Sequence, residues 1–189
     1  MLLDRQYYID YAREHTGDRR FRHTLGVEKL AVELAKLYGE DEKKASVAAI
    51  LHDTAKKMKD KLAAAQNYNI EPDEIEKMMP DLLHGPLAAA VMKRELSITD
   101  DDMLNAVAYH TTGRAGMSRL EKIIYMADLL EENRDFPGVE ELRSAIRKDL
   151  DDGTLKGMAH VLSYLAETYS PICSKSIEAY NYMILEGKK

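Results

Sequence analysis

The chain has 189 residues, 45% of them hydrophobic and 32% charged, and a formal net charge of −6 at pH 7. This composition is typical of a single globular domain and excludes an intrinsically disordered or low-complexity protein. The acidic balance argues against a broad nucleic-acid-binding surface, although a local basic patch could still bind phosphate.

The distribution of apolar and charged residues does not predict a membrane span or a secretion signal. The longest uncharged stretches, such as Leu82 to Met92, have 11 residues, well short of the roughly 18 needed to span a bilayer. The N-terminus has an acid at Asp4 and no continuous apolar segment, unlike a signal peptide. Cys173 is the single cysteine, which excludes an internal disulfide and fits a reducing compartment. We therefore expect a cytoplasmic protein that binds neither membranes nor nucleic acids.

Helical periodicity covers almost the whole chain, and no run alternates long enough to predict a strand. Gly17 and Gly39 follow predicted helix ends, Pro72 suits a first helical position, and Asp100 and Ser118 suit N-caps. The connections are short, so we expect an all-α, compact single domain over residues 1–189. The predicted helices lie near 2–15, 18–38, 42–57, 60–67, 72–79, 86–96, 100–111, 118–132, 138–148, 151–169 and 175–186.

Four of the six histidines lie on apolar helix faces. His23 continues the spacing of a buried stripe, and His52, His84 and His110 align in the same way with neighbouring aliphatic residues. Any one of them, taken alone, is more simply explained as a core histidine with a hydrogen-bond partner. Four such positions in one small chain call for a common explanation.

Two aspartates share this inward placement, Asp53 beside His52 and Asp128 on the core side of its helix. A buried, uncompensated carboxylate costs several kcal/mol, and no inward lysine or arginine is evident on those faces. Imidazole and carboxylate together favour iron, manganese, cobalt, nickel or zinc over magnesium or calcium. Six donors exceed the needs of one open catalytic metal site, so we expect two metals, bridged by Asp53.

The ordered set His23, His52-Asp53, His84, His110 and Asp128 resembles that of the HD-domain metallophosphohydrolase superfamily. Three stretches, RFRHTLGV (20–27), HTTGRAGMSRLEKIIYMADLLEENRDFPGVEELR (110–143) and SKSIEAYN (174–181), are similar to the YqeK-type branch, the bacterial symmetrical bis(5'-nucleosyl)-tetraphosphatases. The resemblance implies a helical HD fold, a di-iron centre and cleavage of diadenosine tetraphosphate into two ADP. Leu129 and Glu132 depart from the aromatic residue and proline expected after Ala127-Asp128.

The resemblance also implies roles for residues. His23, His52, Asp53 and Asp128 would hold one metal, and Asp53, His84 and His110 the other, within a metal-binding core at about 18–132 on which the helices of 138–186 pack. Asp53, Lys56 and His84 are the predicted catalytic residues. The predicted nucleotide-binding residues are Arg20, His23, Asp53, Lys56, His84, Thr111, Asp128, Arg134, Ser174 and Lys175.

Helical spacing supports some of these roles. Lys56 lies one turn after His52 and Arg20 one turn before His23, so each cation can reach phosphate near the metals. An ordinary solvated lysine, and ordinary N-capping at Ser174, explain those positions as well. Arg19 and Arg22 are predicted to lie on a solvated face.

Two other functions remain open from the sequence. The chain could be another HD phosphohydrolase that acts on nucleotides or alarmones, or a non-catalytic nucleotide-binding module whose metals hold the fold. In each case the partner is a small nucleotide, and a homodimer is compatible with the sequence.

Overall fold

The computed structural model describes residues 2–186, which form eleven α-helices, one short 3-10 helix and no β-strand. The predicted all-α class is confirmed. None of the described helices combines the length and apolar character that crossing a bilayer requires. The helices are α1 (Arg5–Thr16), α2 (Asp18–Tyr38), α3 (Glu42–Leu51), α4 (Lys61–Asn67), α5 (Glu74–Met78), η1 (Pro80–Leu83), α6 (His84–Arg94), α7 (Asp101–Ala108), α8 (Arg119–Leu130), α9 (Val139–Lys148), α10 (Leu150–Glu167) and α11 (Ser174–Glu186).

Short polar side chains start most of these helices. Asp100 caps α7 by accepting a hydrogen bond from the amide of Met103. Ser118 and Glu121 form a reciprocal capping box at the start of α8, which satisfies two amide groups that have no partner within the helix. Both predicted N-caps are confirmed, and α8, the central helix of the fold, therefore has a fixed starting point.

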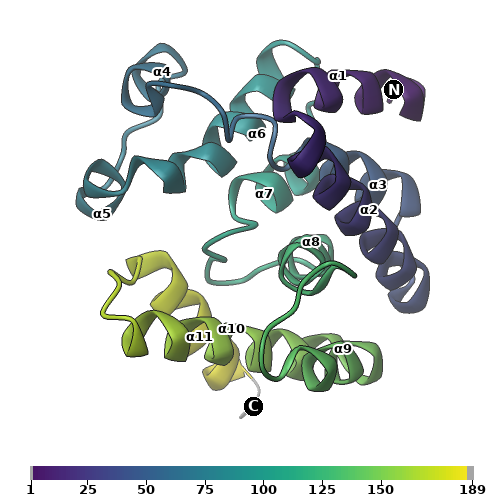
Figure 1. Cartoon of the computed structure of the whole chain (residues 1–189), viewed down its shortest axis with the longest axis vertical. Helices are drawn as coiled ribbons and strands as arrows, with labels where there is room; N and C mark the ends of the chain where they lie inside the picture. The colour runs from purple at the N-terminus through teal and green to yellow at the C-terminus, as the bar shows by residue number, and fades with distance from the viewer. Residues whose placement is uncertain (1, 187–189) are drawn as a thin grey trace.

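Helix α8 passes through the middle of the molecule (Figure 1), with α2, α3 and α7 against one side and α9 and α10 against the other. Its side chains are correspondingly apolar on several faces, since Leu120, Ile123, Ile124 and Met126 are fully buried. A helix that is apolar nearly all round is stable only when other elements cover it. The helix that carries Asp128 is thus covered on several sides by other helices.

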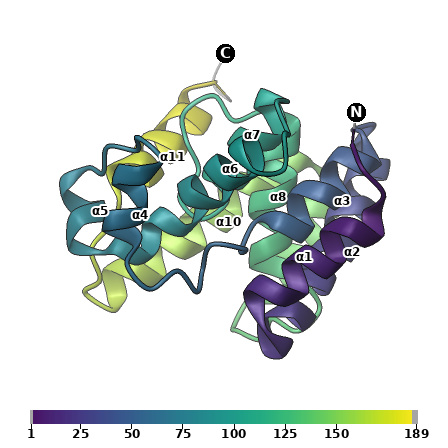
Figure 2. The same ribbon diagram turned by 90° about the horizontal axis from the view of Figure 1, so that it is seen from above.

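The C-terminal helices share this core. Met158 of α10 and Ala179 of α11 belong to the same cluster of buried residues as Tyr8 of α1. At the other edge, the Lys175 ammonium at the start of α11 pairs with Asp73 and Glu76 of α5, both at 2.7 Å, and α5 and α11 lie on the same side of the molecule in Figure 2. One continuous core supports the single-domain prediction.

Two predicted helices end earlier than the periodicity indicates. Helix α3 stops at Leu51 rather than residue 57, and the chain continues in turns, with the Lys56 amide donating to the Asp53 carbonyl at 2.9 Å. Helix α7 stops at Ala108, so His110 also lies beyond its helix. Leu51 and Ala55 are both fully buried, so the apolar spacing persists through the turns although the α-helical hydrogen bonding does not. The prediction of a helix through the His-Asp pair is wrong.

Candidate metal centre

The six polar residues singled out from the sequence come together beside α8. They lie on several helices and on the segments that directly follow helices, so the cluster forms only when the helices are assembled. We call it the six-residue cluster. It consists of His23 from α2, His52 and Asp53 from the turn after α3, His84 at the start of α6, His110 after α7, and Asp128 in α8.

In all four imidazoles of the cluster, Nδ1 faces an oxygen acceptor. A carbonyl or carboxylate oxygen can only accept, so Nδ1 carries the proton and, in the neutral ring, Nε2 carries the lone pair. This arrangement is typical of histidines that bind metals through Nε2. The Nδ1 to oxygen distances are 3.2 Å for His23 with Glu131 Oε1, 2.6 Å for His52 with the Ala49 carbonyl, 2.5 Å for His84 with the Asp81 carbonyl and 2.7 Å for His110 with the Val107 carbonyl.

The Nε2 atoms of the four rings face inward, toward the Asp53 carboxylate. Nε2 of His84 lies 3.0 Å from Nε2 of His110, and burial together with neighbouring imidazoles lowers the pKa of His110 to about 3, so this ring is neutral near pH 7. Two lone pairs at that separation repel each other. In the neutral rings, Nε2 of His23 and of His52 are buried acceptors that face carboxylate oxygens and receive no hydrogen bond from any described residue. Unpaired buried acceptors are costly, and a cation would satisfy them.

Asp53 divides the imidazoles into two pairs. Its Oδ2 lies 3.8 Å from Nε2 of His23 and 3.3 Å from Nε2 of His52. Its Oδ1 lies 3.3 Å from Nε2 of His84 and 3.9 Å from Nε2 of His110. Because each carboxylate oxygen faces a different pair, one carboxylate can contribute to two adjacent cation sites.

Asp128 completes one of these sites. Its Oδ1 lies 3.0 Å from Nε2 of His23 and 4.0 Å from Nε2 of His52. Burial alone would raise the pKa of Asp53 and of Asp128, but the positive charge that neighbouring histidines carry when protonated, together with Arg134 for Asp128, holds both pKa values well below the usual range. Both carboxylates are therefore ionised, as metal ligands must be.

Among residues 2–186, two groups of donor atoms lie close enough to hold an ion, since the atoms of each group are within 4.8 Å of one another. The groups are His23 with His52 and Asp128, and His52 with Asp53 and His110. The first group is the core of the predicted first site. The second differs from the prediction because it contains His52 and omits His84. Nitrogen and carboxylate donors of this kind bind divalent transition metals.

A glycine brings His84 and His110 together. A Cβ at Gly85, next to His84, would lie 2.6 Å from the Ala108 carbonyl oxygen at the end of α7. Only a residue without a side chain permits that approach of backbones. The contact between α6 and α7 thereby sets the separation of the two imidazoles.

The predicted phosphate-binding cations surround the cluster. Arg20 donates to Asp53 Oδ2, and Arg134 donates to Asp128 Oδ1 at 2.8 Å. Lys56 Nζ lies 3.4 Å from His84 Nδ1 and 2.6 Å from Asp81 Oδ2. Thr111 Oγ1 lies 3.3 Å from His84 Nε2, and so belongs to the same neighbourhood.

Ser174 and Lys175 are placed differently. Lys175 makes its ion pairs with Asp73 and Glu76 of α5. Among the described residues, neither Ser174 nor Lys175 forms a hydrogen bond or ion pair with the six-residue cluster. Their predicted contact with nucleotide stays a prediction.

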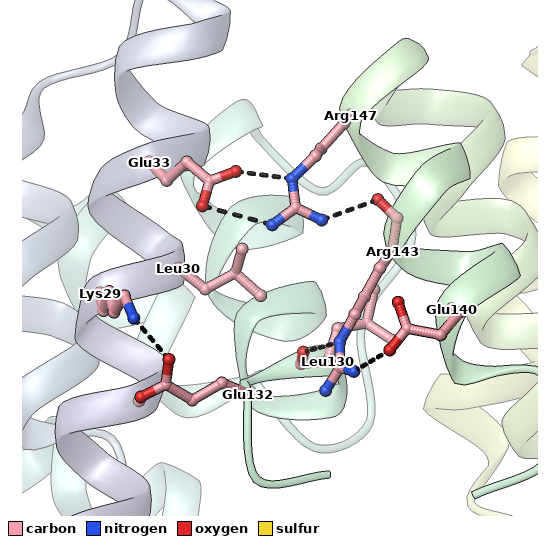
Figure 3. A pocket seen from close by; sticks show the side chains of 9 residues that line it. Lys29, Leu30, Glu33, Leu130, Glu132, Glu140, Arg143 and Arg147 are labelled. Atoms are coloured by element: carbon pink, nitrogen blue, oxygen red, sulfur yellow. Dashed lines mark hydrogen bonds and ion pairs between the residues drawn. The ribbon is translucent and has the colours of Figure 1, made fainter. Parts of the chain in front are cut away.

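Two supporting residues were not predicted from the sequence. Glu131 is buried, holds His23 and accepts hydrogen bonds from the backbone and side-chain nitrogens of Asn133, both at 2.8 Å. Arg143 of α9 donates to three carbonyl oxygens in this loop, those of Leu130 at 2.9 Å, Glu131 at 2.6 Å and Arg134 at 3.0 Å. Figure 3 shows Arg143 reaching from α9 to Leu130. In the sequence, the only indication of these supporting roles is that Glu131 follows Asp128 closely.

Comparison with known proteins gives consistent results. The family model of the HD domain matches residues 20–133, a span that contains the six-residue cluster. A protein of Halalkalibacterium halodurans named symmetrical bis(5'-nucleosyl)-tetraphosphatase is 37% identical over 98% of this chain and 100% of its own length. A protein of the same name from Bacillus subtilis is 35% identical over 96% of this chain and 98% of its own length.

The structural comparison extends over the same range. A crystal structure from Clostridium acetobutylicum, described as a predicted HD superfamily hydrolase involved in NAD metabolism, superposes with a TM-score of 0.93. That protein is 37% identical, and the match covers 98% of this chain and 100% of the other. Family model, relatives and fold agree, and the chain belongs to the HD domain family.

Proposed function

We propose that the protein hydrolyses dinucleoside tetraphosphates symmetrically, and that it cleaves diadenosine tetraphosphate into two molecules of ADP. Relatives that match nearly the whole chain carry the name of that activity. The observation that carries the proposal is the Asp53 carboxylate, whose two oxygens face separate pairs of inward Nε2 atoms. Such a pair of sites suits phosphoryl transfer.

The resident metals would be two transition metal ions, which we propose to be iron. His23, His52, Asp53 and Asp128 would hold one, and Asp53, His84 and His110 the other. Bound there, such ions lower the pKa of water from 15.7 to about 7 and polarise phosphoryl oxygens. The nitrogen-rich donor set supports a transition metal over magnesium or calcium.

The surrounding side chains would bind and orient the phosphates. Arg20 and Arg134 lie against ligand carboxylates and present planar guanidinium groups, which suit phosphate oxygens. Lys56 lies beside His84 and Asp81, where its ammonium would stabilise charge that develops on the transferred phosphoryl group. Thr111 adds a hydroxyl donor next to His84. ADP is a stable leaving group, so no strong general acid is required.

Product analysis tests the proposal. Anaerobically prepared protein incubated with diadenosine tetraphosphate should yield ADP as the sole nucleotide product, and elemental analysis should find about two iron atoms per chain. Equal amounts of ATP and AMP would mean asymmetric cleavage and would contradict the proposal. A panel containing nucleoside mono- and triphosphates and alarmones should react far more slowly. Faster hydrolysis of any of these would assign the site to a different nucleotide.

A further inference from the structure

A large cavity opens next to the six-residue cluster, between the start of α2, the turn after α3 and the loop after α8. Its volume is about 710 Å³, within the range of small-molecule binding sites. We call it the arginine cavity, and its principal lining residues are Arg19, Arg20, Arg22, His23, Lys57 and Arg134. His23 belongs to both regions, so the cavity borders the proposed metal centre.

The cavity is strongly cationic in a protein whose net charge is −6. Of its five cationic side chains, Arg20 and Arg134 contact the carboxylates of the cluster. Within the described part of the chain, Arg19, Arg22 and Lys57 form no ion pair. Arg19 and Arg22 are exposed, as predicted, and both line this cavity.

The acids of the cavity do not neutralise this charge. Asp18 and Glu131 line it, and Glu131 is engaged by His23 and Asn133. Cations that gather without acidic partners repel one another, and an anionic ligand removes that repulsion.

Lys57 lies at the junction of two helices beside this cavity. Its Nζ lies so close to Gly17 that a Cβ there would be 2.2 Å from it. Gly17 is both the C-cap of α1 and the N-cap of α2. The α1 dipole favours an ammonium there and the α2 dipole disfavours it, so the two effects oppose each other. The free amides at the start of α2 favour phosphate, and Lys57 would contact a phosphate bound there.

We propose that the arginine cavity binds one nucleoside diphosphate half of the substrate, which remains there as product, with Lys57, Arg19 and Arg22 contacting the phosphates that lie away from the metals. The inference rests on the proposed function and deepens it. Lys57 follows Lys56 directly but, unlike it, has no carboxylate partner among the residues that the structure describes. The two lysines would therefore have different tasks, the reacting phosphoryl group for Lys56 and the bound half for Lys57.

Calorimetric titration of the holoenzyme with ADP tests this inference. Lys57→Ala should weaken ADP binding about tenfold, the size of one charge-assisted contact. The matched control is Lys59→Ala, which removes an exposed lysine two residues further on, outside the cavity lining, and should change nothing. Metal content should be the same in both variants. With diadenosine tetraphosphate, Lys57→Ala should raise KM by more than it lowers kcat.

Stability gives an independent readout. Without nucleotide, Lys57→Ala should unfold at about the same temperature as the parent protein, because Lys57 is exposed and forms no ion pair with any described residue. The double variant Arg19→Ala, Arg22→Ala, both at exposed positions, should also lose ADP affinity. Unchanged ADP affinity in both variants would overturn the inference. A lower unfolding temperature for Lys57→Ala with unchanged affinity would also overturn it, since Lys57 would then be structural.

The two proposals fail in different ways. If the parent protein binds ADP through Lys57 but does not cleave the tetraphosphate, the proposed function is wrong and the cavity assignment stands. If cleavage to ADP occurs while ADP binding is insensitive to Lys57, Arg19 and Arg22, the function stands and the cavity assignment is wrong.

Discussion

Glu131 Oε1 lies 3.2 Å from Nδ1 of His23, while Nε2 of the same ring faces the cluster. A buried carboxylate outside the proposed ligand set thereby fixes the tautomer and orientation of a ligand. Glu131→Ala should reduce metal affinity or activity about 10- to 100-fold, the usual effect of losing such a partner.

Chelator competition and turnover assays measure this effect. The neighbouring Glu132→Ala serves as the control, because Glu132 is exposed and pairs with Lys29 at 2.5 Å on the surface. Equal metal retention in the two variants would contradict a supporting role for Glu131.

His84→Ala removes one of the two imidazoles that face Asp53 Oδ1. We expect the metal content to fall below two per chain and turnover to be nearly abolished, with the helical circular dichroism unchanged. His160→Ala, which removes a histidine that stacks on Phe136 at 4.8 Å between ring centroids, should retain both metals. Full turnover in His84→Ala would favour metals that only hold the fold.

Arg143 fixes the loop that carries Glu131 and Arg134. Arg143→Ala leaves three carbonyl oxygens without this donor, and should lower the free energy of unfolding by roughly 1–3 kcal/mol and weaken metal binding. Arg147, one turn later in α9, pairs with Glu33 at the surface (Figure 3), so Arg147→Ala should cost less than about 1 kcal/mol. Denaturant titration compares them, and equal losses would contradict the assigned role.

Gly85→Ala should separate His84 from His110, since its Cβ would press on the Ala108 carbonyl. We expect a loss of roughly 1–3 kcal/mol from overpacking together with lower metal occupancy. Gly39→Ala is the control for destabilisation alone. It strains a left-handed cap with φ +68°, at a cost of about 1 kcal/mol, far along α2 from the cluster. Metal loss in both variants would mean that occupancy follows global stability.

The pairing of Lys175 with Asp73 predicts a pH dependence. The ammonium holds the pKa of Asp73 below its usual range, so the folded state binds this proton less readily than the unfolded chain does. The contribution to stability is fully present above the unfolded value of about 3.9 and is lost as pH falls through the lower folded pKa. The difference in unfolding free energy between the parent protein and Lys175→Met should shrink as pH falls below about 4. A constant difference would show that Asp73 is not the responsible group.

The sequence predicted the inward-facing residues better than the backbone around them. His52 and His110 were correctly placed toward the core, because apolar spacing reports which side chains are buried. The same spacing continued past the ends of α3 and α7, where the turns after α3 bury Ala55 as well as a helix would. The spacing of apolar residues does not show where the backbone hydrogen bonding changes from a helix to turns.

Long-range partners were beyond the reach of periodicity. Arg143 and the loop that it holds lie up to 13 residues apart in the chain, and Lys57 approaches Gly17 from another element. Arg19 and Arg22 resemble ordinary surface residues until the fold places Lys57 and Arg134 around the same cavity. Such cooperation between distant side chains appears only when the helices are assembled.

The four Nδ1 contacts mean that folding alone decides which nitrogen each imidazole offers. The rings therefore lose most of their rotational freedom on folding, before any ion binds, and metal binding requires little rearrangement. We therefore expect the metal ions to bind to a protein that is already folded, unlike small zinc domains, which remain unfolded until they bind metal.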